Sequence, residues 1–240
     1  MSLGFFVTAY KEVRATEELL RNIRLLHPQS PIYLVSDGGF DFGEVVLRLG
    51  ISNLHFRLDQ DSLSSTFQVT DNNFRQKEQQ QAIHTAINCF LERITEAISI
   101  MNVTSLVVAD PDTKFRRNLE YLTGRPLIGS LVNTHLPPGV NNVLLEFGGV
   151  EIKGFGANPA IFRVDKFQEG LKRIESVKKE FFTRLSNEFY AVYAYDLLIP
   201  IIFSMAGERE EFNSEIVECR RNRFWRFSRK AIVHQFRKYY

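Results

Sequence analysis

The stretch SLVVADPD, residues 105–112, decides the fold that we expect for this chain. Its first five residues form a short apolar run that is typical of a buried strand. Pro111 has no N–H for a strand ladder, so the strand ends here and the chain turns out of the sheet. The sequence therefore predicts that Asp110 and Asp112 are two close carboxylates at the end of a buried strand.

The beginning of the chain predicts neighbouring strands of the same sheet. Residues 4–10 (GFFVTAY) indicate a first buried strand, and residues 16–26 indicate a helix that Pro28 stops. Residues 32–35 (IYLV) indicate a second strand, which is followed by SDGG at residues 36–39. Such a strand–helix–strand unit predicts a parallel sheet that binds ligands at the carboxyl ends of its strands.

The remaining sequence predicts further elements of one domain. We expect a polar loop at 62–73, further strands at 54–58, 126–132, 143–147 and 160–164, and helices at 76–98, 165–185 and 196–206. No repeat, low-complexity tract or linker divides residues 1–240. The predicted fold is a single α/β domain with a mixed, mainly parallel central sheet flanked by helices.

The composition is that of an ordinary globular protein, with 44% apolar and 24% charged residues. No secretory signal is visible, and the longest apolar run, residues 197–206, is about half of the ~20 residues that a membrane-spanning helix needs. Cys89 and Cys219 lie far apart without a Cys-x-x-Cys pattern, which favours free thiols in a reducing compartment. We therefore expect a soluble, cytoplasmic protein.

The aspartates of residues 110–112 are candidate metal ligands. Two close carboxylates repel one another unless a cation neutralises them. Mg²⁺ and Mn²⁺ prefer oxygen ligands and often share them with a substrate diphosphate. The alternative is an Asp-Pro-Asp turn whose carboxylates cap the next helix.

Asp37 is a second candidate, because it follows the second strand at the same edge of a parallel sheet. A carboxylate at this edge could accept hydrogen bonds from a nucleotide base or a ribose. The glycines after it allow a ligand to approach the backbone closely. A simple turn is the alternative for this residue too.

Together these features resemble the GT-A-fold glycosyltransferases, which use nucleotide-sugars. The resemblance rests on Thr8-Ala9-Tyr10, on SDGG at residues 36–39, and on Asp110-Pro111-Asp112, which is similar to that family's Asp-x-Asp motif. It is specific from about residue 4 to residue 113. It implies a nucleotide-sugar-binding half, residues 1–113, and an acceptor-binding half, residues 114–240.

The resemblance implies where the donor would bind. The residues after the first strand would line the base pocket, the carboxylate after the second strand would hold the base or ribose, and a glycine-containing segment would close over the sugar. The residues that would contact the nucleotide-sugar are Thr8, Ala9, Tyr10, Asp37, Lys77, Asp110, Asp112, Gly154 and Gly156.

The resemblance also implies a metal and a catalytic base. Mn²⁺ or Mg²⁺ would be bound by Asp110, Asp112 and the late His234. Asp196 would be the base of an inverting transfer, although Tyr195 stands where the family usually has Glu. Other candidate bases are Glu146, Glu151 and Glu188. The implied reaction moves a hexose or pentose from a nucleoside-diphosphate donor, in the first place a UDP-sugar, to a hydroxyl of a glycan, glycoprotein or glycolipid.

Two other enzyme classes compete with this interpretation. Haloacid-dehalogenase phosphatases share an Asp-x-Asp-Thr sequence, but they need Thr or Val where this chain has Lys114. Sugar-phosphate nucleotidyltransferases share a similar sheet, but they need a glycine-rich basic loop after the first strand. Residues 11–14 (KEVR) supply the charge without a glycine.

The end of the chain suggests a binding module as a further alternative. Residues 219–240 carry eight Lys or Arg side chains, no Asp or Glu, and several interleaved aromatic residues. Segments that bind nucleic acids or membrane surfaces share this composition. We expect diphosphate and acceptor contacts here rather than nucleic-acid binding, and peripheral membrane contact is compatible with a lipid-linked acceptor.

Overall fold

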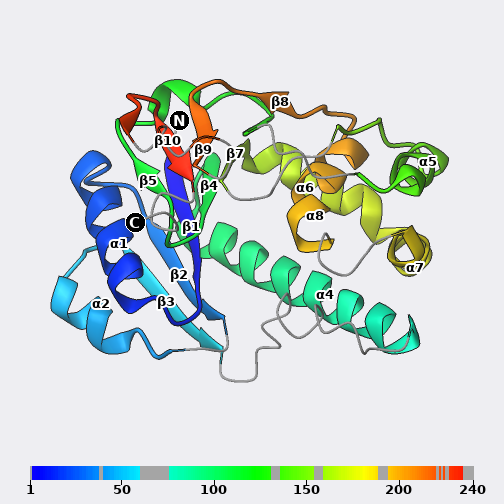
Figure 1. Cartoon of the computed structure of the whole chain (residues 1–240). Helices are drawn as coiled ribbons and strands as arrows, with labels where there is room; N and C mark the ends of the chain where they lie inside the picture. The colour runs from blue at the N-terminus through cyan, green and yellow to red at the C-terminus, as the bar shows by residue number, and fades with distance from the viewer. Residues whose placement is uncertain are drawn as a thin grey trace.

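The computed structural model describes residues 2–37, 40–59, 76–130, 136–153, 159–188, 194–219, 222, 224 and 227–234. Within these ranges, the side chains of residues 76–83, 86, 194–196 and 218 are outside the description. The predicted loop at 62–73 and the glycine-containing segment at 154–158 also lie outside it. Figure 1 shows a central sheet with helices on both sides.

The central sheet has seven strands in the order β3-β2-β1-β4-β7-β6-β8. Four parallel strands form one half: β1 (Leu3–Ala9), β2 (Ile32–Asp37), β3 (Leu54–Asp59) and β4 (Ser105–Ala109). The other half consists of β7 (Ala160–Arg163), β6 (Leu127–Gly129) and β8 (Glu211–Phe212), with β7 antiparallel to both of its neighbours. The prediction of a mixed, mainly parallel sheet is confirmed.

Alternating side chains of the strands pack into two separate hydrophobic cores, one on each face of the sheet. Phe5 and Val7 of β1 pack with Leu19 and Ile23 of α1 (Val13–Leu26) and with residues of α2 (Gly43–Leu49). Phe6, between them, faces the opposite core. Because every second residue of a strand points to the same face, this uniformly apolar strand must be covered by helices on both sides.

The second core lies under a larger group of helices, as Figure 1 shows. Its long helix α4 (Gln76–Met101) packs on β1 and β2, and the helices α6 (Val164–Glu175) and α8 (Ala194–Met205) pack against each other beside it. Helices α5 (Pro138–Glu146) and α7 (Lys178–Glu188) complete this layer. No helix in the described ranges is long and apolar enough to cross a bilayer.

Two sequence predictions in this layer were wrong. Residues 143–147, expected as a strand, belong mainly to α5, which begins at Pro138 and buries Val140, Val143 and Leu144 at helical spacing. The single helix expected at 165–185 is two helices, α6 and α7, separated by a turn in which the N–H of Val177 donates to the carbonyl of Ile174 (2.9 Å). That turn lets α7 pack against α5.

A small second sheet lies against the α1 side of the molecule. It consists of β5 (Lys114–Phe115), β10 (Ile232–His234) and β9 (Ile216–Glu218), with β10 in the middle. The side chain of Asn22 in α1 holds β5 in place: its amide donates to the carbonyl of Phe115 (3.1 Å) and accepts from the N–H of Phe115 (2.8 Å). This sheet brings the end of the described chain back to the end of β4 (Figure 1).

Candidate metal centre

The two aspartates lie on a tight turn at the carboxyl end of β4. The strand ends at Ala109, and the N–H of Thr113 donates to the carbonyl of Asp110 (3.0 Å). The turn leaves the side chains of Asp110 and Asp112 partly open to solvent, at 37% and 29% of their full exposure. Part of each side chain is therefore open to a ligand, whereas Oδ1 of Asp112, which faces His234, is buried.

His234 completes a three-residue cluster with these aspartates. Its Nε2 atom lies 3.3 Å from Oδ1 of Asp112 and 3.8 Å from Oδ2 of Asp110. The pairing of β10 with β5 explains this position: Val233 pairs with Lys114, so the next residue of β10 lies beside the turn that precedes β5. One ligand atom from each of the three residues lies within 4.8 Å of the ligand atoms of the other two.

The electrostatics of the cluster reflect the protein that surrounds its carboxylates. Desolvation by the surrounding protein raises the pKa of Asp110, because loss of water disfavours the carboxylate. The neighbouring His234 opposes this shift, and the negative charge of Asp112 adds to it. A bound cation would offset the cost of desolvating the Asp110 carboxylate and would reduce its repulsion with Asp112.

The donor set fits a divalent cation. Two carboxylate oxygens and one imidazole nitrogen are ligands that Mn²⁺ accepts, and Mg²⁺ accepts the two oxygens readily. Three protein ligands at this turn would leave coordination positions for water or for the oxygens of a substrate. The predicted grouping of Asp110, Asp112 and His234 in space is confirmed.

The carboxyl ends of β1 and β2 lie at the same sheet edge. Thr8 pairs with Val35 and Ala9 with Ser36, so Tyr10 and Asp37 follow at neighbouring positions. The hydroxyl oxygen of Thr8 is buried and has no hydrogen-bond partner among the described residues. Strand β2 is two strand spacings from β4, so the two strands are roughly 10 Å apart across the sheet.

Asp37 is held by an arginine that the sequence analysis missed. The Nη1 atom of Arg93, in α4, donates to Oδ1 of Asp37 (2.7 Å). The one available signal was the place of Arg93 on the apolar face of the helix, between Phe90 and Ala97, where a charge needs a partner. The partner itself comes from a distant strand and could not be read from the pattern.

The remaining predicted residues stay untested. Lys77 and Asp196 lie in α4 and α8, but their side chains are outside the description, and Gly154 and Gly156 are outside it altogether. Of the other candidate bases, Glu146 is hydrogen-bonded to Arg184 on the surface (2.8 and 3.2 Å). The proposed roles of these residues remain predictions.

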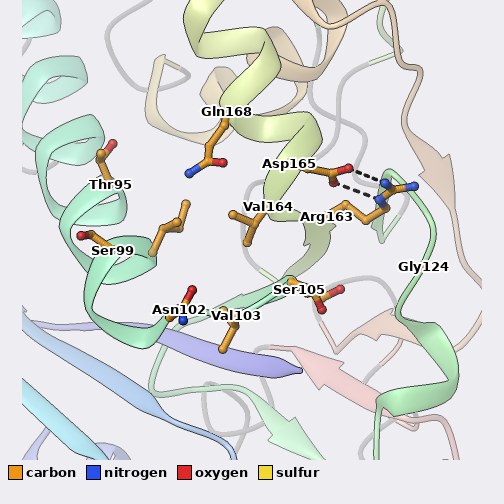
Figure 2. Close-up of a pocket in the computed structure, with 12 residues that line it drawn as sticks. Thr95, Ser99, Asn102, Val103, Ser105, Gly124, Arg163, Val164, Asp165 and Gln168 are labelled. Atoms are coloured by element: carbon orange, nitrogen blue, oxygen red, sulfur yellow. Dashed lines mark hydrogen bonds and ion pairs between the residues drawn. The ribbon is translucent and has the colours of Figure 1, made fainter. Parts of the chain in front are cut away.

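A cleft of about 760 Å³ lies at the other end of β4. Figure 2 shows it between α4 and the start of α6, with Ser105, the first residue of β4, and the Arg163–Asp165 ion pair at its border. Asp110 follows the last residue of the same strand, so this cleft is separate from the metal centre. Its lining is mostly uncharged, and it contains none of the three candidate metal ligands.

Comparisons with known proteins give limited matches. No protein-family model and no curated protein matches the sequence. Two crystal structures of LgtC are similar in fold: an active-site mutant at 12% identity, and the galactosyltransferase LgtC in complex with donor and acceptor sugar analogues at 14% identity. Each match covers 96% of this chain and 86% of LgtC, with a TM-score of 0.48. A likeness of this size identifies neither a substrate nor a reaction for this chain.

Proposed function

We propose that this protein is a metal-dependent glycosyltransferase that takes a sugar from a nucleoside-diphosphate donor. The observation that carries the proposal is the cluster of Asp110, Asp112 and His234 at the sheet edge where β1 and β2 also end, close to Thr8 and at Asp37. A cation site and a nucleoside site on strands roughly 10 Å apart suit a molecule that has a base at one end and a diphosphate at the other.

Each end of the site has a separate task. Asp110, Asp112 and His234 bind the cation, which when present neutralises negative charge on the departing diphosphate. Asp37 accepts a hydrogen bond from the base or the ribose, and Thr8 offers its buried hydroxyl beside it. These contacts orient the donor before transfer, and orientation accounts for a large part of the rate enhancement of such reactions.

The finer assignments are part of the same proposal. The ion is Mn²⁺ or Mg²⁺, the donor is a UDP-sugar, and the acceptor is a hydroxyl of a glycan, glycoprotein or glycolipid. In an inverting transfer, Asp196 at the start of α8 removes the proton from the attacking hydroxyl. A positioned base of this kind contributes about 10²–10⁴-fold. The proposed cellular location is the cytoplasm.

A thermal-unfolding panel tests the proposal on the full chain. UDP, GDP, CDP and ADP, and the sugar conjugates of the first two, are each added with Mn²⁺, with Mg²⁺ or with EDTA. A ligand at 100 times its dissociation constant adds ~2.7 kcal/mol to the free energy of unfolding. We expect one nucleotide to do so only with the metal. Stabilisation that does not depend on a metal, or none with any nucleotide, would overturn the proposal.

A product assay separates the transferase from a sugar-phosphate nucleotidyltransferase. A transferase releases a nucleoside diphosphate from a nucleotide-sugar. A sugar-phosphate nucleotidyltransferase releases pyrophosphate from a nucleoside triphosphate and a sugar phosphate. Pyrophosphate release alone would replace our proposal with that alternative.

Exposed aromatic side chains favour a second, compatible property, which is peripheral contact with a membrane. Phe224 and Phe227 are 64% and 69% exposed. They belong to the basic segment in which Arg220, Arg221, Arg223 and Arg226 are their close sequence neighbours. Apolar rings among cations suit the boundary of an anionic bilayer, and such contact would bring the enzyme to a lipid-linked acceptor.

A further inference from the structure

A buried network of charges lies beside the proposed nucleoside site. Asp37 and Asp59 are register partners at the carboxyl ends of the parallel strands β2 and β3. Arg93 bridges them: Nη1 donates to Oδ1 of Asp37 (2.7 Å), and Nε donates to Oδ2 of Asp59 (2.5 Å). Arg93 has only 3% of its side chain exposed, so both of its ion pairs are largely withdrawn from water.

The network continues outward from Asp59 to the surface. Arg57 donates to Oδ1 of Asp59 (2.6 Å), so each oxygen of this carboxylate is bound to a different arginine. Arg57 also donates to Glu92 (2.7 Å) and to Glu96 on α4. Asp59 therefore fixes the position of Arg93, and Arg93 fixes the position of Asp37.

The charges explain why Arg93 is needed at this place. Two carboxylates on adjacent strands would repel each other, and each would favour its protonated form. Although burial disfavours a charged guanidinium, the two aspartates keep the pKa of Arg93 above its ordinary value. Burial likewise disfavours the charged Asp59, but hydrogen bonds from Arg57 and Arg93 keep its pKa below the ordinary value.

The arrangement is costly for a purely structural element. The Nη2 atom of Arg93 is buried and has no hydrogen-bond partner in the described ranges. An unsatisfied buried donor costs about 1–3 kcal/mol, and a buried ion pair often stabilises a fold no better than apolar side chains would. Features that break local rules in this way tend to lie at functional sites.

We propose that Arg93 is a positioning residue that holds the carboxylate of Asp37 in the orientation that receives the nucleoside, with Asp59 as its anchor. This inference rests on the proposed function, because it needs Asp37 to contact the nucleoside end of the donor. Arg93 reaches Asp37 from α4, which packs on the face of the sheet that carries Phe6 and Val35. The rigid guanidinium directs Nη1 to Oδ1 of Asp37 while Nε is held by Asp59. The ammonium of a lysine lacks this fixed arrangement of two donors.

The test compares two ligands of the same metal centre. Isothermal titration gives the dissociation constants of Mn²⁺-pyrophosphate and of Mn²⁺ with the tightest binder among UDP, GDP, CDP and ADP. The variants are Arg93→Lys, Arg93→Met and Asp59→Asn. The matched control is Glu92→Gln, which removes an exposed partner of Arg57 without touching Arg93.

We expect the nucleotide to bind on the order of tenfold more weakly to the three variants and normally to the control. Pyrophosphate, which lacks a nucleoside, should bind all four proteins as it binds the wild type. The double variant Asp37→Asn/Arg93→Met should bind the nucleotide no more weakly than Asp37→Asn alone, because both changes remove one interaction. If Arg93→Met does not fold, Arg93→Lys and Asp59→Asn still decide the question.

Three results would overturn the inference. Unchanged nucleotide affinity in Arg93→Lys and Asp59→Asn would show that Asp37 needs no support. An equal loss for pyrophosphate would show a general structural role, and additive losses in the double variant would show that the two residues act independently. If the wild type binds none of the four nucleotides, the proposed function itself fails, which is distinct from these results.

Discussion

The imidazole Nε2 of His234 lies 3.3 Å from Oδ1 of Asp112, although the two residues come from distant parts of the chain. The contact depends on β10 inserting between β5 and β9 and so reaching the turn at the end of β4. None of the three strands of this small sheet was predicted from the sequence, yet the predicted ligands meet beside it. The position of His234 in the cluster therefore depends on the second sheet.

Substitution of Asp112 by alanine should abolish metal binding without unfolding the protein. Asp112 is partly exposed on a turn, so its loss leaves no cavity in the core. In the wild type, Mn²⁺ at 100 times its dissociation constant adds ~2.7 kcal/mol to the free energy of unfolding. We expect no such gain in Asp112→Ala and a reduced gain in His234→Gln, as measured by urea unfolding with and without Mn²⁺. Asp165→Ala, at an exposed aspartate beyond the other end of β4, is the control and should keep the full gain.

Substitution of Asn22 by leucine should weaken both the fold and the metal centre. Asn22 is buried and makes two hydrogen bonds to the backbone of Phe115, which would lose both partners. We expect the free energy of unfolding to fall by about 2–6 kcal/mol, from two unsatisfied backbone groups. Because β5 pairs with β10, Mn²⁺ should also bind less tightly.

Urea unfolding and Mn²⁺ titration of the folded variant measure these two effects. Asn118→Ala removes an exposed asparagine near the same strand and should change neither quantity by much. A destabilised Asn22→Leu variant with wild-type Mn²⁺ affinity would contradict the link between the second sheet and the metal centre.

The parts of the fold that were predictable share a local cause. The strands β1, β2 and β4 are continuous apolar runs, and Pro111 marks the end of the last one, so their place in a parallel sheet follows from the sequence. The prediction of a strand at residues 143–147 was wrong because consecutive apolar residues suit both a buried strand and a helix packed into a core. The two prolines before them, Pro137 and Pro138, were the signal for a helix start.

The parts of the site that were not predictable depend on long-range contacts. The sequence indicated a carboxylate at Asp37, but nothing near it indicated Arg93, which reaches it from another helix. His234 was proposed as a ligand from the resemblance alone, and its path to the turn depends on strand pairing between β5 and β10. Contacts of this kind follow from the packing of whole elements rather than from residue patterns.

His27 should make the protein less stable in mild acid. Burial lowers the pKa of His27, with a smaller opposing effect from Glu120, and neither ring nitrogen has a hydrogen-bond partner among the described residues. The unfolded chain binds a proton near the ordinary pKa of ~6.5, whereas the folded chain does so only at lower pH. The free energy of unfolding should therefore fall from about pH 7 downward, by at most ~1.4 kcal/mol per pH unit, until the folded state is also protonated.

The variant His27→Phe removes this proton and keeps an aromatic ring beside Phe5, whose centroid lies 4.9 Å from that of His27. Urea unfolding at several values between pH 7.5 and 5 should show a shallower pH dependence for the variant than for the wild type. Equal slopes would show that His27 takes up its proton alike in both states.

Loss of the exposed phenylalanines should weaken contact with anionic membranes. In Phe224→Ser/Phe227→Ser, the rings that would enter the bilayer boundary are gone while the basic residues remain. Sedimentation with vesicles of phosphatidylcholine and phosphatidylserine should show a fall in affinity of about tenfold or more, because each buried ring contributes ~1.5 kcal/mol or more. Leu47→Ser, at an 82% exposed leucine of α2, is the control and should bind as the wild type does. RNA binding that weakens steeply as the salt concentration rises, together with no preference for anionic vesicles, would instead assign the segment to nucleic-acid binding.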